Sequence, residues 1–423
     1  MLDRTTPPKV EMLGDFTLPT PKEEILRNGV TLNVLSGGSQ DINQLLLVWR
    51  GGVCEAPSAI VARLASQMLL EGCDGMSSEE VAEALDFRGA IVRAGVGEHF
   101  SELSVVCLNA FSKGLLPLIR KMVLYPNYDG KILEVYKEKE EKNLMMSFSK
   151  VEALSQMAIN SIIMGEGNPM AAVPTIEEIK AVTRDDLLAF HSKAYRASGL
   201  RAYLSGNITD EIYNSVKETL ESLPALESMA LDEHTYVAAD PVTEKVEKAD
   251  ALQSAVKVAF PAPGRDHPDY VPLRFTVMAL GGYFGSRLMK NIREDKGYTY
   301  GIRSYLLGAR DGCYVLISAQ CDNRYVEPLL QEVVNELEHL ATIPVEGDEM
   351  QRLRQYIASA LMETLDSPFS ISDYYKTEYV VNIPAGYFDR QVAIARTLSA
   401  DMIMEMARKY LVPSQMRVVV AGK

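Results

Sequence analysis

The side chains that could hold a metal ion in this chain are few and poorly spaced for that purpose. None of the five histidines stands four residues from another, the spacing that places two imidazoles on one face of a helix. They are His99, His191, His234, His267 and His339. His191 and His339 fall within helical patterns, and His99 leads into a strand, so all three are expected to be structural. The sequence therefore predicts no catalytic metal site built by this chain alone.

Two other groups of possible ligands support the same prediction. The five cysteines form no C-x-x-C pair, so neither a zinc ribbon nor a disulfide framework is indicated, and each is expected to be a small buried side chain. They are Cys54, Cys73, Cys107, Cys313 and Cys321. The charged run KEKEEK contains Glu138, Glu140 and Glu141, and such a run is typical of the solvated face of a helix.

The elements that must position any site can be predicted from hydrophobic periodicity. Alternating apolar residues predict strands over 44–49 and 101–108, and amphipathic patterns predict helices over 58–70 and 78–87. Residues 131–164 are expected to be mostly helical. Strands and helices in this order predict an α+β fold whose sheets are mostly antiparallel.

One αβ unit occurs twice in the chain. Residues 183–206 and 399–422 align without a gap, and each copy begins with a hydroxyl residue at the N-cap position of a helix, Thr183 and Ser399. Both copies end in a strand followed by glycine. A second pair of strand and helix recurs in the same order in both halves, so we interpret the chain as an internal duplication.

The duplication predicts two homologous αβ domains, each a mixed, mostly antiparallel sheet packed with helices. A chain of 423 residues exceeds the size at which one hydrophobic core keeps growing. The polar stretch 222–240, which contains prolines and acidic residues, is suited to a linker. We therefore predict one domain over residues 1–228 and a second over residues 229–423.

Composition limits the classes of partner and the location. A net charge of −14 with scattered lysines and arginines argues against nucleic acid and anionic lipid, and favours peptides or proteins. No apolar run reaches the roughly 18 residues that a membrane span needs. The amino terminus has no apolar core behind a basic start, which predicts a cytoplasmic protein, or a periplasmic one if a signal peptide has been removed.

Residues 280–302, LGGYFGSRLMKNIREDKGYTYGI, form the most specific segment of the sequence. This segment resembles the pitrilysin and insulinase family of zinc peptidases, in its processing-peptidase branch, whose pattern is G-G-x-F-x-S-R-L followed by R-E-x-K-G-x-x-Y. The residues that fit are Gly281, Gly282, Phe284, Ser286, Arg287, Leu288, Arg293, Glu294, Lys296, Gly297 and Tyr300. The resemblance implies the fold of mitochondrial processing peptidases, two homologous αβ halves joined by a linker, which agrees with the duplication.

The resemblance also implies a catalytic role for Arg293 and Tyr300. In the family these two residues extend from the second half toward a zinc ion held by the first half or by a partner chain. When a zinc-bound water attacks a peptide carbonyl, negative charge develops on the carbonyl oxygen, and hydrogen-bond donors aimed at it stabilise the transition state. A guanidinium and a phenol are such donors. Arg287 of the same motif is expected to be structural.

The first half departs from the family at its metal position. Active members have H-x-x-E-H on a helix, with the glutamate as general base and a third, carboxylate ligand on a later helix. Here the equivalent positions are Arg63, Ser66 and Gln67. Arginine is a permanent cation, serine cannot replace the carboxylate base, and glutamine is a poor zinc ligand. The sequence therefore predicts a degenerate metal site that binds no zinc.

Together these features predict the non-catalytic subunit of a heterodimeric zinc metalloendopeptidase. The chain would be inactive alone, and zinc would be bound by a homologous partner subunit that carries H-x-x-E-H. Extended peptides would be the substrates. Two alternatives remain open at this stage. The chain could be a scaffold or peptide-binding protein of the same fold with no part in proteolysis, or a homodimer that binds peptides without cutting them.

Overall fold

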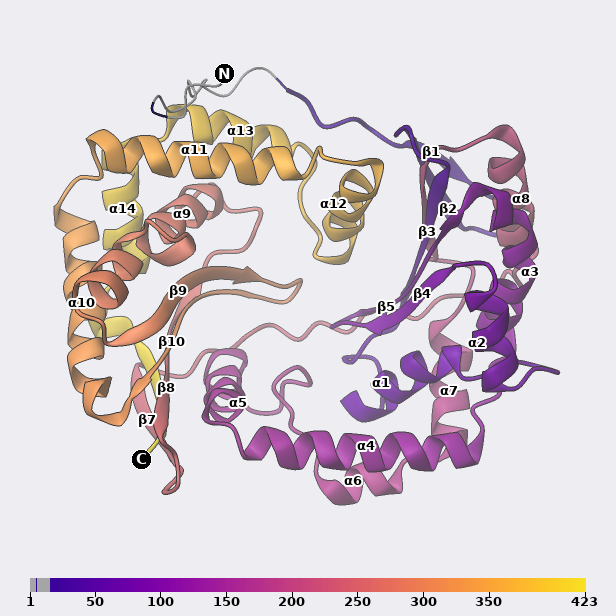
Figure 1. The fold of residues 1–423 in the computed structure, drawn as a ribbon, viewed down its shortest axis with the longest axis horizontal. Coiled ribbons are helices and arrows are strands. Elements are labelled where there is room, and N and C mark those ends of the chain that lie inside the picture. Colours follow the sequence, from indigo (N-terminus) through magenta and orange to yellow (C-terminus); the bar gives the residue numbers. More distant parts are fainter. Residues whose placement is uncertain (1–4, 6–15) are drawn as a thin grey trace.

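The computed structural model describes residue 5 and residues 16–423 of the chain. Two halves, each built around one sheet, lie on either side of a central space (Figure 1). The first half extends through helix α8, which ends at Glu221, and the second begins with strand β7 at Val242. The predicted α+β class with two sheet-containing domains is confirmed.

The N-terminal sheet has six strands in the order β1-β2-β6-β3-β5-β4. The strands are β1 (Lys22–Ile25), β2 (Thr31–Ser36), β3 (Ile42–Arg50), β4 (Ile91–Val96), β5 (Phe100–Leu108) and β6 (Arg201–Gly206). Only β2 and β6 are parallel, and the other neighbours are antiparallel. Strand β3 is buried along nearly its whole length, as expected of a central strand with both faces covered.

Eight α-helices belong to the described part of this half. They are α1 (Ala59–Gln67), α2 (Ser78–Asp86), α3 (Asn109–Leu124), α4 (Gly130–Phe148), α5 (Val151–Met164), α6 (Ile176–Ala181), α7 (Arg184–Ala194) and α8 (Asp210–Glu221). Helix α1 packs on α7 and α3 packs on α8. Their apolar faces enclose one continuous core that includes Leu47, Leu64 and Leu103.

The C-terminal sheet repeats the plan of the first. Its strands are β7 (Val242–Glu247), β8 (Gln253–Ala262), β9 (Thr299–Gly308), β10 (Cys313–Asp322) and β11 (Arg417–Gly422). Their order is β7-β11-β8-β10-β9, and only β7 and β11 are parallel. This is the order and direction of β2-β6-β3-β5-β4 in the first half, so the duplication predicted from the sequence is present in the fold.

The helices of the second half lie mainly on one side of its sheet. They are α9 (Tyr270–Val277), α10 (Val326–Thr342), α11 (Gly347–Glu363), α12 (Pro368–Val380), α13 (Tyr387–Thr397) and α14 (Ala400–Tyr410). Helices α9, α10 and α14 pack on one another over a second large core. The helix caps predicted at Thr183 and Ser399 are formed, because each side chain accepts a backbone N–H of the first turn.

Each half also contributes a helix to the sheet of the other half. Helix α5 packs on β8 and β11, and α12 packs on β6 (Figure 1). The α12 contact includes Tyr203 of β6, whose hydroxyl donates to the carbonyl of Tyr375 at 3.3 Å. Because of this exchange, the division after residue 228 stays a prediction, although it falls in the segment between α8 and β7.

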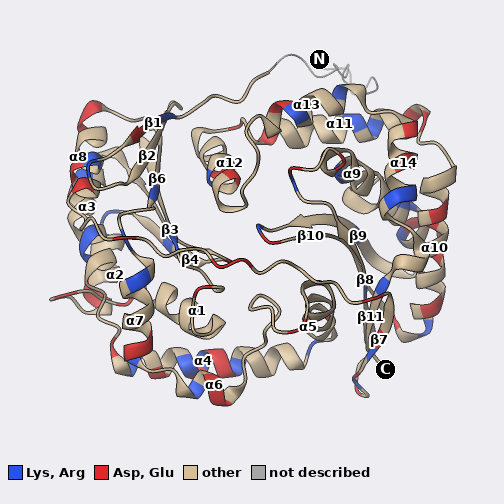
Figure 2. Ribbon diagram, turned by 180° about the vertical axis from the view of Figure 1, so that it is seen from behind, with Lys and Arg blue, Asp and Glu red and all other residues tan. Residues whose placement is uncertain are grey.

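Two predictions from composition can be compared with the described residues. All five cysteines are free and buried, as expected. Lysines and arginines alternate with acidic residues along the outer helices of both halves, with no basic stripe (Figure 2). No helix in the described part of the chain is both long and apolar enough to cross a membrane.

Candidate functional site

Helix α1 carries the degenerate metal position. The helix begins after Ser58, whose side-chain oxygen accepts a hydrogen bond from the backbone N–H of Val61. Ser66 and Gln67 lie one turn after Arg63 on this helix. Ser66 is buried, whereas the Arg63 side chain is 44% exposed. The three positions that the resemblance equates with H-x-x-E-H therefore lie on one helix, and their equivalence to a metal site stays a prediction.

An ion pair joins Arg63 to helix α4. A guanidinium nitrogen of Arg63 lies 3.2 Å from a carboxylate oxygen of Glu140. The prediction that this acidic run is a solvated face is wrong for Glu140, which is buried, whereas the side chain of Glu138 is 70% exposed. The face of α4 that packs toward α1 is buried, and the opposite face is exposed to solvent. A run of charged residues in the sequence does not show which of them lies on the buried face.

The residues at this position do not fit the zinc ion that the fold implies. A guanidinium has no lone pair to offer a metal, and its positive charge repels one. Arg63 also forms an ion pair with the carboxylate of Glu140, which lies on the helix where the third zinc ligand was expected. The buried carboxylate of Glu140 is thus paired with a guanidinium.

This pairing gives a testable effect on stability. We expect Arg63→Met to lower the free energy of unfolding by about 1–2 kcal/mol, because Glu140 would be left buried without a cation, an effect that solvent around the half-exposed arginine reduces. Urea unfolding measures the change. Lys142→Met is the matched control, since its partner Glu138 is largely exposed and the loss should be small. Equal losses in both variants would contradict this account.

The motif of residues 280–302 runs from the end of one π-helix (Met278–Gly282) through a second (Met289–Asp295) and into β9. Gly281 must be a glycine, because a Cβ atom there would lie 2.7 Å from the backbone nitrogen of Ser304 on β9. Gly297, with φ +66°, supplies the left-handed residue of the turn before the strand. Arg287 bonds Glu349 at 2.8 Å. The structural role expected for Arg287 agrees with this contact.

Arg293 and Tyr300 are the parts of this motif that remain open to other molecules. Tyr300, near the start of β9, is 92% exposed. The guanidinium of Arg293 lies over the ring of Phe284, 4.6 Å from its centroid. In the described part of the chain, no ion pair or side-chain hydrogen bond of Arg293 is formed, and none joins either residue to α1. The phenol of Tyr300 is therefore open to an external group, whereas the guanidinium of Arg293 is half-buried over Phe284.

A polar cavity of about 330 Å³ adjoins Tyr300. Its lining includes Glu152, Arg303, Tyr305, Ser318 and Gln320, from α5, β9 and β10. Gln320 donates to Glu152 at 3.0 Å. The cavity thus combines hydrogen-bond donors and acceptors beside an exposed phenol, which suits the backbone and side chains of a peptide.

Strand β9, which carries Tyr300, is also an edge strand. It pairs with β10 on one side and with no other strand of the described sheet, and β4 occupies the corresponding edge of the first half. An edge strand presents unpaired N–H and C=O groups to which an extended peptide can add. The two equivalent edges are therefore candidate peptide-binding sites.

The sequence did not reveal a second polar cluster between the halves. Cys54, Glu55, His99 and Asp311 come together there, and all four side chains are buried or nearly so. His99 was predicted to be structural, and its two hydrogen bonds agree with that role. The other three gave no signal, because they stand in separate segments without a motif.

Two duplicated αβ halves, one with an exposed Tyr300 and one whose metal position lacks zinc ligands, are the features expected of a zinc-peptidase homologue without a metal site of its own. Residues 181–357 match the family described as peptidase M16 inactive domain. This match agrees with the resemblance carried by residues 280–302.

The relatives support the same family. A Helicobacter pylori protein named non-peptidase homolog YmxG is 24% identical over 262 residues, which is 60% of this chain and 60% of that protein. A Bacillus subtilis protein named uncharacterized zinc protease YmxG is 22% identical over 73% of this chain and 75% of its own length. A crystal structure of a peptidase M16 inactive domain from Pseudomonas fluorescens covers 95% of this chain and 98% of its own, with a TM-score of 0.86 and 21% identity. This last likeness shows the fold.

Proposed function

We propose that this chain is the non-catalytic subunit of a heterodimeric zinc endopeptidase. In this proposal a homologous partner subunit carries H-x-x-E-H and holds the zinc ion. The chain itself supplies Arg293 and Tyr300, which bind the substrate and stabilise the transition state at the partner's metal. Extended peptides are the substrates.

The observation that supports this proposal most directly is the contrast between the two halves. In the first half, the metal position is closed by the ion pair of Arg63 and Glu140. In the second half, Tyr300 is almost fully exposed and Arg293 has no ionic partner among the described residues. A phenol and a guanidinium without hydrogen-bond partners among the described residues are available as donors to a developing oxyanion.

The surroundings of Tyr300 support peptide substrates. A peptide that added to the edge of β9 would place alternate side chains toward the polar cavity beside Tyr300. Its backbone would be held in an extended form, which is the conformation that a metal-bound water can attack. We propose that the protein is located in the cytoplasm. Cell fractionation tests this location, and recovery in the periplasmic fraction would indicate that a signal peptide had been removed.

Reconstitution with a partner tests the proposal. This chain and a homologous H-x-x-E-H chain are purified separately and together, and each sample is assayed with an unstructured fluorogenic peptide before and after chelator treatment. We expect this chain to be inactive alone, and its addition to raise the partner's zinc-dependent turnover. Zinc-dependent cleavage by this chain alone would overturn the proposal. Peptide binding without any rise in the partner's turnover would support the scaffold alternative instead.

A phenylalanine at position 300 provides a narrower test. In the two-chain enzyme, Tyr300→Phe should lower kcat/KM about tenfold, because it removes one neutral hydrogen-bond donor worth about 1–1.5 kcal/mol. The ring and its packing are kept. Tyr125→Phe is the matched control, since Tyr125 is 53% exposed at the end of α3, and it should leave kcat/KM unchanged. A Tyr300→Phe enzyme with normal kcat/KM would remove the phenol from the mechanism.

A further inference from the structure

A cluster of metal-ligating side chains lies between the two halves, and none of its residues belongs to α1 or to the 280–302 motif. Cys54 and Glu55 follow β3, and His99 precedes β5. Asp311 belongs to the turn between β9 and β10 of the second half. His99 is 1% exposed and Cys54 is 7% exposed. The cluster therefore joins segments that are distant in the sequence and keeps them from solvent.

The geometry of this cluster is that of a small coordination site. The Sγ atom of Cys54, a ring nitrogen of His99 and a carboxylate oxygen of Asp311 all lie within 4.8 Å of one another. The Nε2 atom of His99 is 2.8 Å from Asp311, and its Nδ1 atom is 2.5 Å from Glu55. A carboxylate on the far nitrogen of a histidine is the usual means of orienting a metal-binding imidazole.

The backbone around the cluster holds its carboxylates in place. Glu55 accepts a hydrogen bond from the N–H of Gly52 at 2.8 Å, and Asp311 accepts one from the N–H of His234 at 3.1 Å. His234 lies in the segment that joins the halves, and its ring stacks on that of His99 with centroids 6.4 Å apart. The Nε2 atom of His234 is buried and has no hydrogen-bond partner among the described residues. The joining segment therefore packs against the cluster through the His234 ring and its backbone N–H.

The charges of the cluster are unbalanced. Glu55, Glu98 and Asp311 surround a single imidazole, and Glu98 is held by hydrogen bonds from Tyr236 and from the backbone N–H of Arg310. Carboxylates gathered in a buried site are costly unless a cation offsets their charge.

We propose that Cys54, His99 and Asp311 bind a divalent transition-metal ion of the zinc type, with Glu55 orienting His99 from the second nitrogen. A thiolate, an imidazole and a carboxylate are ligands that zinc accepts, whereas calcium and magnesium prefer oxygen ligands alone. Binding releases the thiol proton of Cys54 to solvent, so that sulfur coordinates as the thiolate. A water molecule can complete the coordination of a zinc ion held by three protein ligands.

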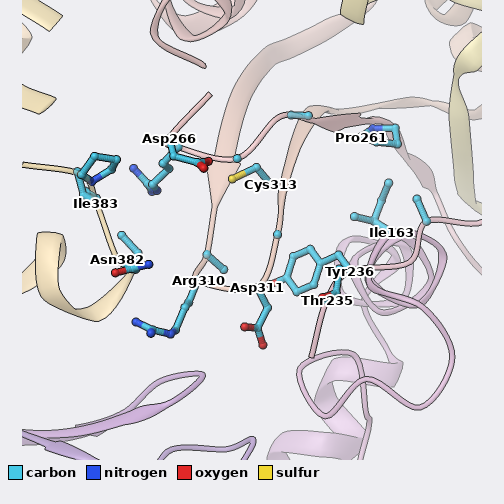
Figure 3. Close-up of a pocket in the computed structure, with 18 residues that line it drawn as sticks. Ile163, Thr235, Tyr236, Pro261, Asp266, Arg310, Asp311, Cys313, Asn382 and Ile383 are labelled. Atoms are coloured by element: carbon cyan, nitrogen blue, oxygen red, sulfur yellow. The ribbon is translucent and has the colours of Figure 1, made fainter. Parts of the chain in front are cut away.

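The position of the site indicates a structural role for this metal. It ties the loop after β3, the joining segment and the β9–β10 turn to one another, so it fixes the two halves relative to each other. Asp311 also lines a cavity of about 520 Å³, together with Tyr236 and Cys313 (Figure 3). The cluster therefore borders this cavity through Asp311.

Metal analysis of the full chain tests the proposal. The purified protein is stripped with a chelator, incubated with zinc, desalted and analysed by mass spectrometry of the metal. We expect about one zinc ion per chain, a rise of a few degrees in the melting temperature, and at least a tenfold loss of affinity in Cys54→Ser and in Asp311→Asn. Cys321→Ser and Asp322→Asn, on β10, are the matched controls and should keep the metal.

Cobalt provides a readout that does not depend on how the variants fold. Cobalt bound to the unmodified chain should show a sulfur-to-cobalt charge-transfer band, which reports thiolate coordination directly. The proposal is overturned if the unmodified chain retains no zinc, if the band is absent, or if folded Cys54→Ser and Asp311→Asn retain as much metal as the controls. If the chain retains no metal, the cluster is instead an ion pair of protonated His99 with the carboxylates of Glu55 and Asp311.

Discussion

Arg293→Ala in the assembled two-chain enzyme should lower kcat/KM about a hundredfold, because loss of one oxyanion donor costs roughly 2.7–4 kcal/mol of transition-state stabilisation. In the proposed role the guanidinium is available to a bound substrate, since Phe284 supports it from one side and no ion pair of the described residues neutralises it. Most of the loss should appear in kcat, because the charge on the carbonyl oxygen develops only in the transition state.

The stability of the variant separates this effect from misfolding. Arg293 contacts Phe284 through a cation–π interaction at the surface, and such contacts contribute about 0.5–1 kcal/mol. The free energy of unfolding should therefore change little. Arg293→Lys should keep the charge but lose the planar geometry of the donors, and should recover only part of the activity. Arg324→Ala, at an exposed arginine on the same half, should behave like the unmodified chain.

Stability should also fall between pH 6.5 and pH 4 because of His191. Burial lowers the pKa of this histidine from its usual 6.5 to about 4. Its Nε2 atom lies 2.8 Å from the carbonyl oxygen of Val123, and its ring packs against Tyr128 and Tyr195. The folded chain therefore holds the neutral imidazole, with the N–H donated to a backbone carbonyl.

The sign of this dependence follows from which state takes up the proton. Above pH 6.5 both the folded and the unfolded chain hold His191 neutral, so the residue makes its full contribution. As the pH falls toward 4, only the unfolded chain binds the proton, and the free energy of unfolding decreases by up to about 3 kcal/mol. Below pH 4 the folded chain is protonated too, and no further loss arises from this group.

Urea unfolding at a series of pH values measures this contribution. His191→Gln should flatten the profile between pH 6.5 and pH 4, because glutamine keeps a side-chain N–H and does not titrate. Ser192→Ala, at the next and exposed position of α7, controls for a general weakening of the helix and should keep the original slope. A His191→Gln profile parallel to that of the unmodified chain would show that this histidine is not responsible.

Local features of the fold could be predicted from the sequence because they depend on nearby residues. The strand expected at 44–49 is the central part of β3, and the helix expected at 58–70 is α1 with the short turn after it. The pattern at residues 280–302 was equally informative, because close approach at Gly281 and a positive φ at Gly297 restrict those positions to glycine. These constraints arise within a few residues or within one motif.

Contacts between distant segments could not be predicted in the same way. Glu140 has the same composition around it as Glu138, and only the packing of α4 beside α1 buries one and exposes the other. The exchange of α5 and α12 between the sheets also leaves no local pattern, because an amphipathic helix does not specify the surface that it covers.

The sequence by itself determined the chemistry available at the metal position, because ligand capacity belongs to the residue type. Arg63, Ser66 and Gln67 cannot form a zinc site in any fold. Only the tertiary structure showed that Arg63 pairs with Glu140 at the metal position. Only the tertiary structure brought Cys54 and His99 close to Asp311. Those contacts join residues far apart in the chain, and their distances are set by the packing of whole elements, which no local pattern encodes.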